Sequence, residues 1–215
     1  MSERHHRNSP PRSPAFTIGL AAVVFVGATF VSSGALAPRE AQASVAIAMS
    51  LDDLARGSSV IARITPLDHE SVWENGRIIT YSRVRVDDVV AGSTPSSARE
   101  LRVRTLGGRV GNIGQTVEGE AALTASEPSI VFLAAARSDH TTDVVVVGRA
   151  QGQLRVRRDT HGQEVVRLGG VGEIIARQVR PPLRPAGTPV IELQGAPVAS
   201  VVTDAKRAWE AGHAH

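Results

Sequence analysis

Short segments in which every second residue is apolar constrain the fold of this 215-residue chain more than any other feature. In the first, 60–65, the residues at even positions are all apolar, and they alternate with Ile61, Arg63 and Thr65. This is the period of a half-buried β-strand. Comparable segments follow at 78–90, 101–105, 129–135, 143–148, 154–158 and 164–168. Turn-forming residues separate them, so the chain should fold mainly as an antiparallel β-sheet.

A tight turn and a long strand indicate a small barrel. Asn75 and Gly76 accept the positive φ angles of a two-residue hairpin turn, so the strands on either side should pair. In the following strand, 78–90, the apolar parity changes between Tyr81 and Val84, which is a change that a β-bulge or a sharp coil of the strand produces. Because long bent strands turn the corners of small barrels, we expect a small barrel.

Residues 130–133 predict a central strand, because they are all apolar and both faces should be covered. We expect Phe132 to lie in this strand and to pack under the long strand that carries Val84 and Val86. The last two predicted strands flank a loop at 159–162, so they should form an extra hairpin appended to the barrel.

Two helices complete the predicted α+β fold. Ser50 can cap a short helix at 50–56, with Asp53 at the reciprocal capping position. Apolar residues at helical spacing predict a second helix at 198–211. Several prolines before it mark an extended linker or arm. The predicted divisions are a signal peptide (1–43), a β-barrel-like domain with an appended hairpin (44–179), a proline-rich arm (180–197), and a C-terminal helix with its tail (198–215).

The N-terminus has the order of a secretory signal peptide. Arginines precede an uncharged run at 15–37, and small residues at Ala41 and Ala43 form a pattern that signal peptidase reads. We expect cleavage between Ala43 and Ser44, which makes the mature chain periplasmic or extracellular. The alternative is that 15–37 is retained as an inner-membrane anchor, since it is long enough to span a bilayer.

Composition restricts how the mature chain is stabilised and what it binds. The leader carries four arginines and two glutamates, which leaves 20 basic and 19 acidic residues after cleavage. A nearly neutral domain lacks a general surface for polyanions. The chain has no cysteine, so a hydrophobic core must stabilise it without disulfides. That core should be aliphatic, because the mature part holds only four aromatic residues, Trp73, Tyr81, Phe132 and Trp209.

A recurring order of strands and glycines links the chain to known proteins. Its landmarks are 58–61, Trp73, 76–81, 84–90, Gly92, Val103, Gly107, Gly108, Gly111, Phe132 and Leu133. These residues resemble the pattern of a group of uncharacterised secreted bacterial β-domain proteins. The strand layout is also similar to netrin-type OB barrels, the fold of tissue inhibitors of metalloproteinases. Those inhibitors use an N-terminal cysteine and disulfides, which this chain lacks, so the resemblance implies a fold and no inhibitory residue.

One segment begins like a metal-binding pattern. His69 and Glu70 match the start of the zinc-protease motif H-E-x-x-H, but Trp73 occupies the position of the second histidine. The turn that follows leaves no room for the motif's helix. We therefore interpret 69–73 as a solvated connection between strands.

A glycine-rich segment is the expected recognition loop, because loops on barrels carry binding. It follows a strand as phosphate-binding loops do, but no amphipathic helix follows it. Its glycines suit backbone conformations that other residues rarely adopt. The residues assigned to this loop are Gly107, Gly108, Arg109, Gly111, Asn112 and Gly114.

Arginines alternate with apolar residues on several predicted strands, at positions 83, 85, 102, 104, 155, 157 and 167. An OB-like barrel with arginines could follow a nucleic-acid backbone, but binders of single strands also need aromatic stacking platforms. These arginines should instead lie on solvated faces and pair with acids such as Asp87 and Asp88. His213 and His215 lack the third ligand that a metal site requires.

We expect an exported, non-enzymatic β-domain that binds a protein or an envelope component. The sequence assigns no catalytic residue, cofactor, metal site or nucleic-acid partner. The alternatives are a secreted hydrolase whose site is assembled from dispersed residues, and a membrane-tethered envelope protein that keeps 15–37.

Overall fold

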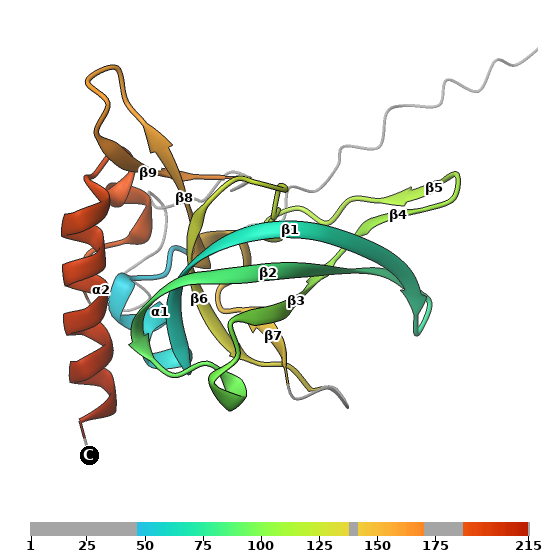
Figure 1. The fold of residues 1–215 in the computed structure, drawn as a ribbon, viewed down its shortest axis with the longest axis horizontal. Coiled ribbons are helices and arrows are strands. Elements are labelled where there is room, and N and C mark those ends of the chain that lie inside the picture. The colour runs from blue at the N-terminus through green and yellow to red at the C-terminus, as the bar shows by residue number, and fades with distance from the viewer. Residues whose placement is uncertain (1–46, 138–141, 170–186, 215) are drawn as a thin grey trace, which may run out of the picture. The chain divides into compact units, whose positions relative to one another are not determined.

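The computed structural model describes residues 47–137, 142–169 and 187–214. The predicted cleavage site at Ala43 and Ser44 and the alternative anchor at 15–37 lie outside these residues. The described part is an α+β fold, a mainly antiparallel sheet with two α-helices, which confirms the predicted fold class (Figure 1). Among the described helices, none is both long and apolar enough to cross a membrane.

The elements follow the predicted order, with two further short strands, β4 and β5, where a glycine-rich loop was expected. The strands are β1 (Val60–Glu74), β2 (Arg77–Gly92), β3 (Glu100–Leu106), β4 (Gly108–Val110), β5 (Ile113–Gln115), β6 (Ser129–Ala135), β7 (Asp143–Val146), β8 (Gln153–Arg158) and β9 (Glu164–Leu168). The α-helices are α1 (Leu51–Gly57) and α2 (Val198–His213). Short 3₁₀ turns lie at Pro95–Ser97, Arg149–Gly152 and Val190–Leu193.

Five strands are paired in a ring. β1 pairs with β2 along one edge and, over Val60–Ile64, with β6 along the other. β2 continues to β3, β3 pairs in parallel with β7, and β7 returns to β6. The order of pairing is therefore β1–β2–β3–β7–β6–β1. β8 and β9 extend the sheet from β6, and β4 and β5 form a separate hairpin.

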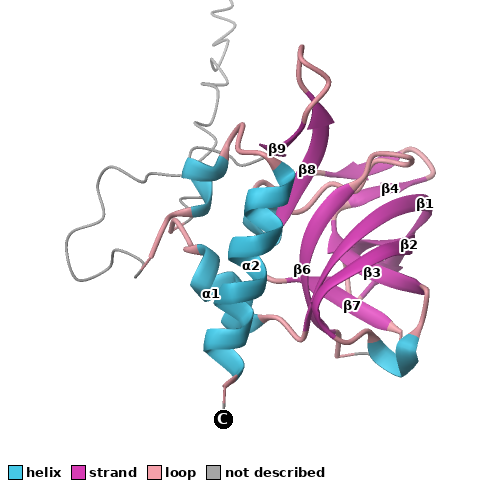
Figure 2. Ribbon diagram, turned by 60° about the vertical axis from the view of Figure 1, so that its left-hand side comes forward, coloured by secondary structure: helices cyan, strands magenta, loops and turns pink. Residues whose placement is uncertain are grey.

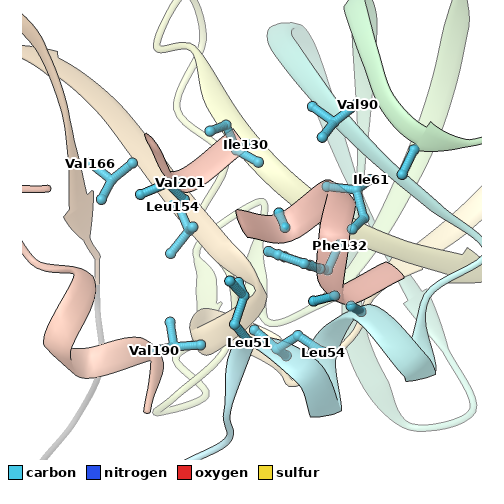
Figure 3. Close-up of a cluster of buried hydrophobic side chains, with 14 of the residues drawn as sticks. Leu51, Leu54, Ile61, Val90, Ile130, Phe132, Leu154, Val166, Val190 and Val201 are labelled. Atoms are coloured by element: carbon cyan, nitrogen blue, oxygen red, sulfur yellow. The ribbon is translucent and has the colours of Figure 1, made fainter. Parts of the chain in front are cut away.

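Two hydrophobic clusters lie on opposite faces of the ring strands. The first draws buried side chains from all five, among them Val60, Val84, Val103, Leu133 and Val144, and so fills the interior of the ring. The second lies between the sheet and the helices (Figure 3). Alternate residues of a strand point to opposite faces, so one strand can serve both clusters.

Both helices cover the same side of the sheet (Figure 2). Asp53 N donates to Ser50 Oγ at 3.1 Å, and Ser50 N donates to Asp53 Oδ2 at 3.2 Å, which confirms the predicted capping box of α1. α2 buries Val198, Val201 and Ala205, as its spacing predicts. It runs through Gly212 to His213, slightly beyond its predicted end. Of the predicted arm, 187–197 is described, and Val190 within it is buried in the helix-facing cluster.

The first strand is longer than predicted. Asn75 and Gly76 make the expected hairpin turn, with φ angles of 50° and 76°. However, β1 does not end near residue 65, and the supposed connection at 69–73 is wrong because these residues pair with β2 up to the turn. A solvated strand with polar side chains on both faces has no clear alternation, so its sequence resembles a loop.

The parity change between Tyr81 and Val84 coincides with a register shift, but the extra residue, Leu67, lies on β1 and not on β2. The register of β2 with β3 is continuous from Ile79 to Arg85. Register shifts occur instead between β1 and β2, at Ile61/Ala62, Arg63/Ile64 and Pro66/Asp68. Ile78 and Ile79 are both buried, so the change of parity reflects cover on both faces of β2 and no extra residue in that strand.

Phe132 lies in a central strand that is buried from Ser129 to Leu133, as predicted. β6 pairs with β1 on one edge and with β7 and β8 on the other. Phe132 does not, however, pack under Val84 and Val86. It faces the helices in the second cluster, with Leu51, Leu54 and Val201, while its neighbours in sequence face the ring interior (Figure 3).

Candidate functional site

An open cleft of about 920 Å³ lies along β1, β2 and β3. The side chains at Tyr81, Arg83 and Arg102 line it, and they have the opposite parity to Val84 and Val103 in the ring interior. The cleft extends from the end of the β1–β2 hairpin to the start of β7. Five acids (Asp68, Glu70, Glu74, Glu100, Asp143), three arginines (Arg83, Arg102, Arg137) and two aromatic residues (Trp73, Tyr81) are in its lining.

Four charged side chains form a row across the strands of the cleft. The pairing register places Asp68 beside Arg83, Arg83 beside Arg102, and Arg102 beside Asp143. Each arginine therefore has an acidic neighbour, and both form ion pairs with it. Arg102 donates from Nε and Nη2 to the two carboxylate oxygens of Asp143, at 2.5 and 2.7 Å. Asp143 is only 1% exposed, so this two-point contact offsets the cost of burying its charge.

A second network fixes the aromatic ring of Tyr81. Tyr81 Oη donates to Glu74 Oε2 at 2.7 Å, and Arg104 Nη2 donates to Glu74 Oε1 at 2.8 Å. The guanidinium carbon of Arg102 lies 4.4 Å from the ring centroid of Tyr81, a cation–π contact. The hydrogen bonds from Tyr81 and Arg104 hold the pKa of Glu74 below its usual value. Burial, and then the bond to Glu74, raises the pKa of Tyr81.

Trp73 and Glu70 both contribute to the lining at the hairpin end of the cleft, from opposite faces of β1, because Trp73 has the parity of Ser71 and Glu70 has the parity of Glu74. Trp73 is 52% exposed, which is unusual for the largest apolar side chain in a chain with so few aromatic residues. Glu70 is exposed as well, and it lies opposite Tyr81 in the register. The cleft thus has a floor of ion pairs, and the exposed Trp73 lies at its rim.

This arrangement is suited to recognition. Fixed charges and a fixed aromatic ring present the same pattern to every ligand, so little order has to be imposed on binding. In the part of the chain that the structure describes, no group of three or more His, Cys, Asp or Glu side chains could hold a metal ion.

The predicted recognition loop forms the hairpin β4–β5. Gly107, Gly108 and Gly111 have φ angles of 90°, 127° and 58°, so glycine is needed at these three positions, whereas Gly114 has no such φ. A side chain at Gly108 would collide with Ser71 and Thr80, so glycine also permits the hairpin to lie close to β1 and β2. Arg109 Nε bonds to the carbonyl of Gly111 within the hairpin at 2.9 Å.

This loop and the charged cleft are separate sites. Gly107, Gly108 and Arg109 border a second hollow, of about 590 Å³, on the face of β1 and β2 that carries Ser71 and Thr80. Sequence analysis did not assign the cleft residues, although one signal was present. Acids occupy three of the four even positions from 68 to 74, namely Asp68, Glu70 and Glu74, and so share the parity of one strand face.

The predicted role of the strand arginines is confirmed in the main. Arg85 bonds to Asp87 at 2.8 Å, as expected, and most of the others pair with acids that no local pattern indicated. These further pairs are Arg83–Asp68, Arg102–Asp143, Arg104–Glu74 and Arg157–Glu127.

Comparison of the chain with protein-family models, with curated proteins and with solved structures found no match.

Proposed function

We propose that this chain is an exported, non-enzymatic binding module for a protein or an envelope component, and that the cleft is its binding surface. The ring of five strands, with β3 and β7 parallel, supports an OB-like barrel of the netrin-type layout. OB folds bind their ligands on the face of the second and third strands, between the loop that joins the first two strands and the loop that joins the last two. The cleft has this position, because β2 and β3 form its floor and the β1–β2 hairpin borders it.

The exposed ring of Trp73 is the observation that carries this proposal. Interface energy concentrates in a few large side chains, of which Trp, Tyr and Arg are the most frequent. The cleft brings all three types together, with Tyr81 and Arg102 stacked on its floor and Trp73 at its rim. A partner that covered Trp73 would remove its apolar ring from water and so gain binding free energy.

The titration behaviour of the floor favours binding over proton transfer. A general acid or base works best when its pKa lies near the operating pH. The pKa of Glu74 is lowered by Tyr81 and Arg104, and the pKa of Tyr81 is raised by burial. Both shifts move the pKa values away from 7. At neutral pH these two groups therefore keep one charge state and act as fixed contacts.

Capture of a partner by the exported protein tests this proposal. The wild-type protein, immobilised and exposed to the organism's envelope fraction, should retain a specific component. Trp73→Ala should reduce the retained amount by about tenfold or more, as loss of an interface anchor does. Ile113→Ala is the matched control, because Ile113 is 56% exposed but lies on the β4–β5 hairpin, outside the cleft. Equal retention by both variants would contradict the proposal.

A further inference from the structure

The outer half of β1 has an open edge. β6 pairs with β1 only from Val60 to Ile64, and Ser126 N then donates to the carbonyl of Pro66 at 2.9 Å. Beyond that point, no strand in the described part of the chain pairs with this edge of β1. The edge is therefore open from Leu67 to Glu74, while the other edge is paired with β2 from Asp68 to Glu74 (Figure 1).

The hairpin register shows which backbone groups face this edge. In a two-residue hairpin the residues that flank the turn, here Glu74 and Arg77, exchange hydrogen bonds, and pairs alternate from there. The carbonyl of Ile78 accepts from Gly107 N at 2.8 Å, so it points towards β3 and away from Trp73. Trp73, Ser71 and His69 consequently direct their own N–H and C=O groups outward, where a further strand would bind them.

The charge of residues 67–74 indicates which kind of strand can pair with this edge. Asp68, Glu70 and Glu74 share one parity on the cleft face, and the lining of the cleft has more acids than arginines. Antiparallel pairing with a second copy, centred on Ser71, would place Asp68 opposite the other copy's Glu74. Like charges directly opposite each other destabilise a sheet, so self-pairing is disfavoured and a basic strand is favoured.

We propose that the edge of β1 from Leu67 to Glu74 binds an extended, basic segment of a partner polypeptide by strand addition. Backbone bonds to His69, Ser71 and Trp73 supply affinity, and lysine or arginine at alternate positions, facing the acids of the cleft, supplies specificity. This inference rests on the proposed binding function and names the chemistry of the partner.

A synthetic peptide as long as the open edge, with lysine at alternate positions, is the probe. The exported protein should bind it, as measured by fluorescence anisotropy, and should bind a peptide with glutamate in place of lysine at least about tenfold more weakly. Methylation of alternate backbone nitrogens separates strand addition from simple charge attraction, because it removes donors and leaves the charge unchanged. Methylating one alternate set should abolish binding, and methylating the other set should not. Which set is sensitive reports whether the added strand is antiparallel or parallel.

A pair of variants tests the same contact from the side of the protein. Glu70→Lys should weaken peptide binding about tenfold, since it reverses a charge on the cleft face. Glu118→Lys makes the same charge change at an exposed glutamate outside the cleft, so it should leave binding unchanged.

Several results would overturn the inference. The first is that the two peptides methylated at alternate sets of nitrogens bind equally well. The second is that the lysine and glutamate peptides bind equally well. The third is that light scattering shows a dimer of the protein that the peptide does not dissociate. If the peptide fails while capture still depends on Trp73, the edge inference is wrong and the proposed function stands. If peptide binding shows the predicted pattern while Trp73→Ala captures normally, the cleft is not the partner's main surface.

Discussion

Glu120 shows how one buried side chain can link stability to pH. Its side chain is 11% exposed, and the nearest cationic atom, Arg149 Nε, lies 3.8 Å from Oε2. Burial raises the pKa of Glu120, and the charge of Arg149 opposes this effect. The folded chain therefore binds a proton at this site more readily than the unfolded chain, so stability falls as pH rises between the unfolded and folded pKa values.

Glu120→Gln should consequently stabilise the protein at pH 7, by about 1 kcal/mol or less, because the ion pair that it removes is partly exposed. Urea unfolding at a series of pH values measures the effect. The difference between the two proteins should stop changing below about pH 3, where Glu120 is protonated in both states. A variant that is less stable at pH 7, or a difference that does not change with pH, would contradict this account.

At the scale of an element, β6 is the strand on which the sheet depends most. It has partners on both edges and buried side chains on both faces, and Phe132 in it is fully buried. Phe132→Ala should lower the free energy of unfolding by about 3–5 kcal/mol, the usual effect of emptying a buried aromatic site. Arg104→Ala is the comparison, because its ion pair with Glu74 is partly exposed and should be worth about 1 kcal/mol or less. Urea titration of both variants measures the two free energies of unfolding. A Phe132→Ala variant of nearly unchanged stability would show that Phe132 does not pack in the cluster as described.

The elements that the sequence predicted well are those with local causes. Ser50 caps α1 through bonds to a residue three positions away, and Asn75 and Gly76 turn because of their own backbone preferences. The outer half of β1 was missed, because its pairing depends on β2 and it has no buried face to impose alternation. Phe132 was placed in the correct strand but on the wrong face, since parity alone does not say which of two clusters a face meets.

The candidate site was harder to predict than the fold, for a reason of distance along the chain. Arg102 and Asp143 are 41 positions apart and meet only because β3 and β7 are parallel neighbours. The predicted recognition loop had a visible local signal in its glycines, and those glycines shape a hairpin. The spacing of the acids in β1 was a weaker signal, because it can be interpreted only once they are known to share one face of a strand.

At the scale of the whole described chain, the two hydrophobic clusters stabilise different parts of the fold. The ring interior closes the strands on one another, and the helix-facing cluster attaches α1, α2 and the hairpin β8–β9 to them. The paired strands β1 and β2 extend away from the helices (Figure 1). The surface proposed for binding is thus held by the ring yet left uncovered by α1 and α2.

The central claim is that this uncovered surface is where the partner binds. Backbone amide hydrogen exchange of the wild-type protein, with and without the component that it retains from the envelope fraction, tests it most directly. We predict that the partner slows exchange at the outward amides of His69, Ser71 and Trp73, with little change in α2. Protection confined to the β4–β5 hairpin or to α2, with exchange along β1 unchanged, would contradict the claim.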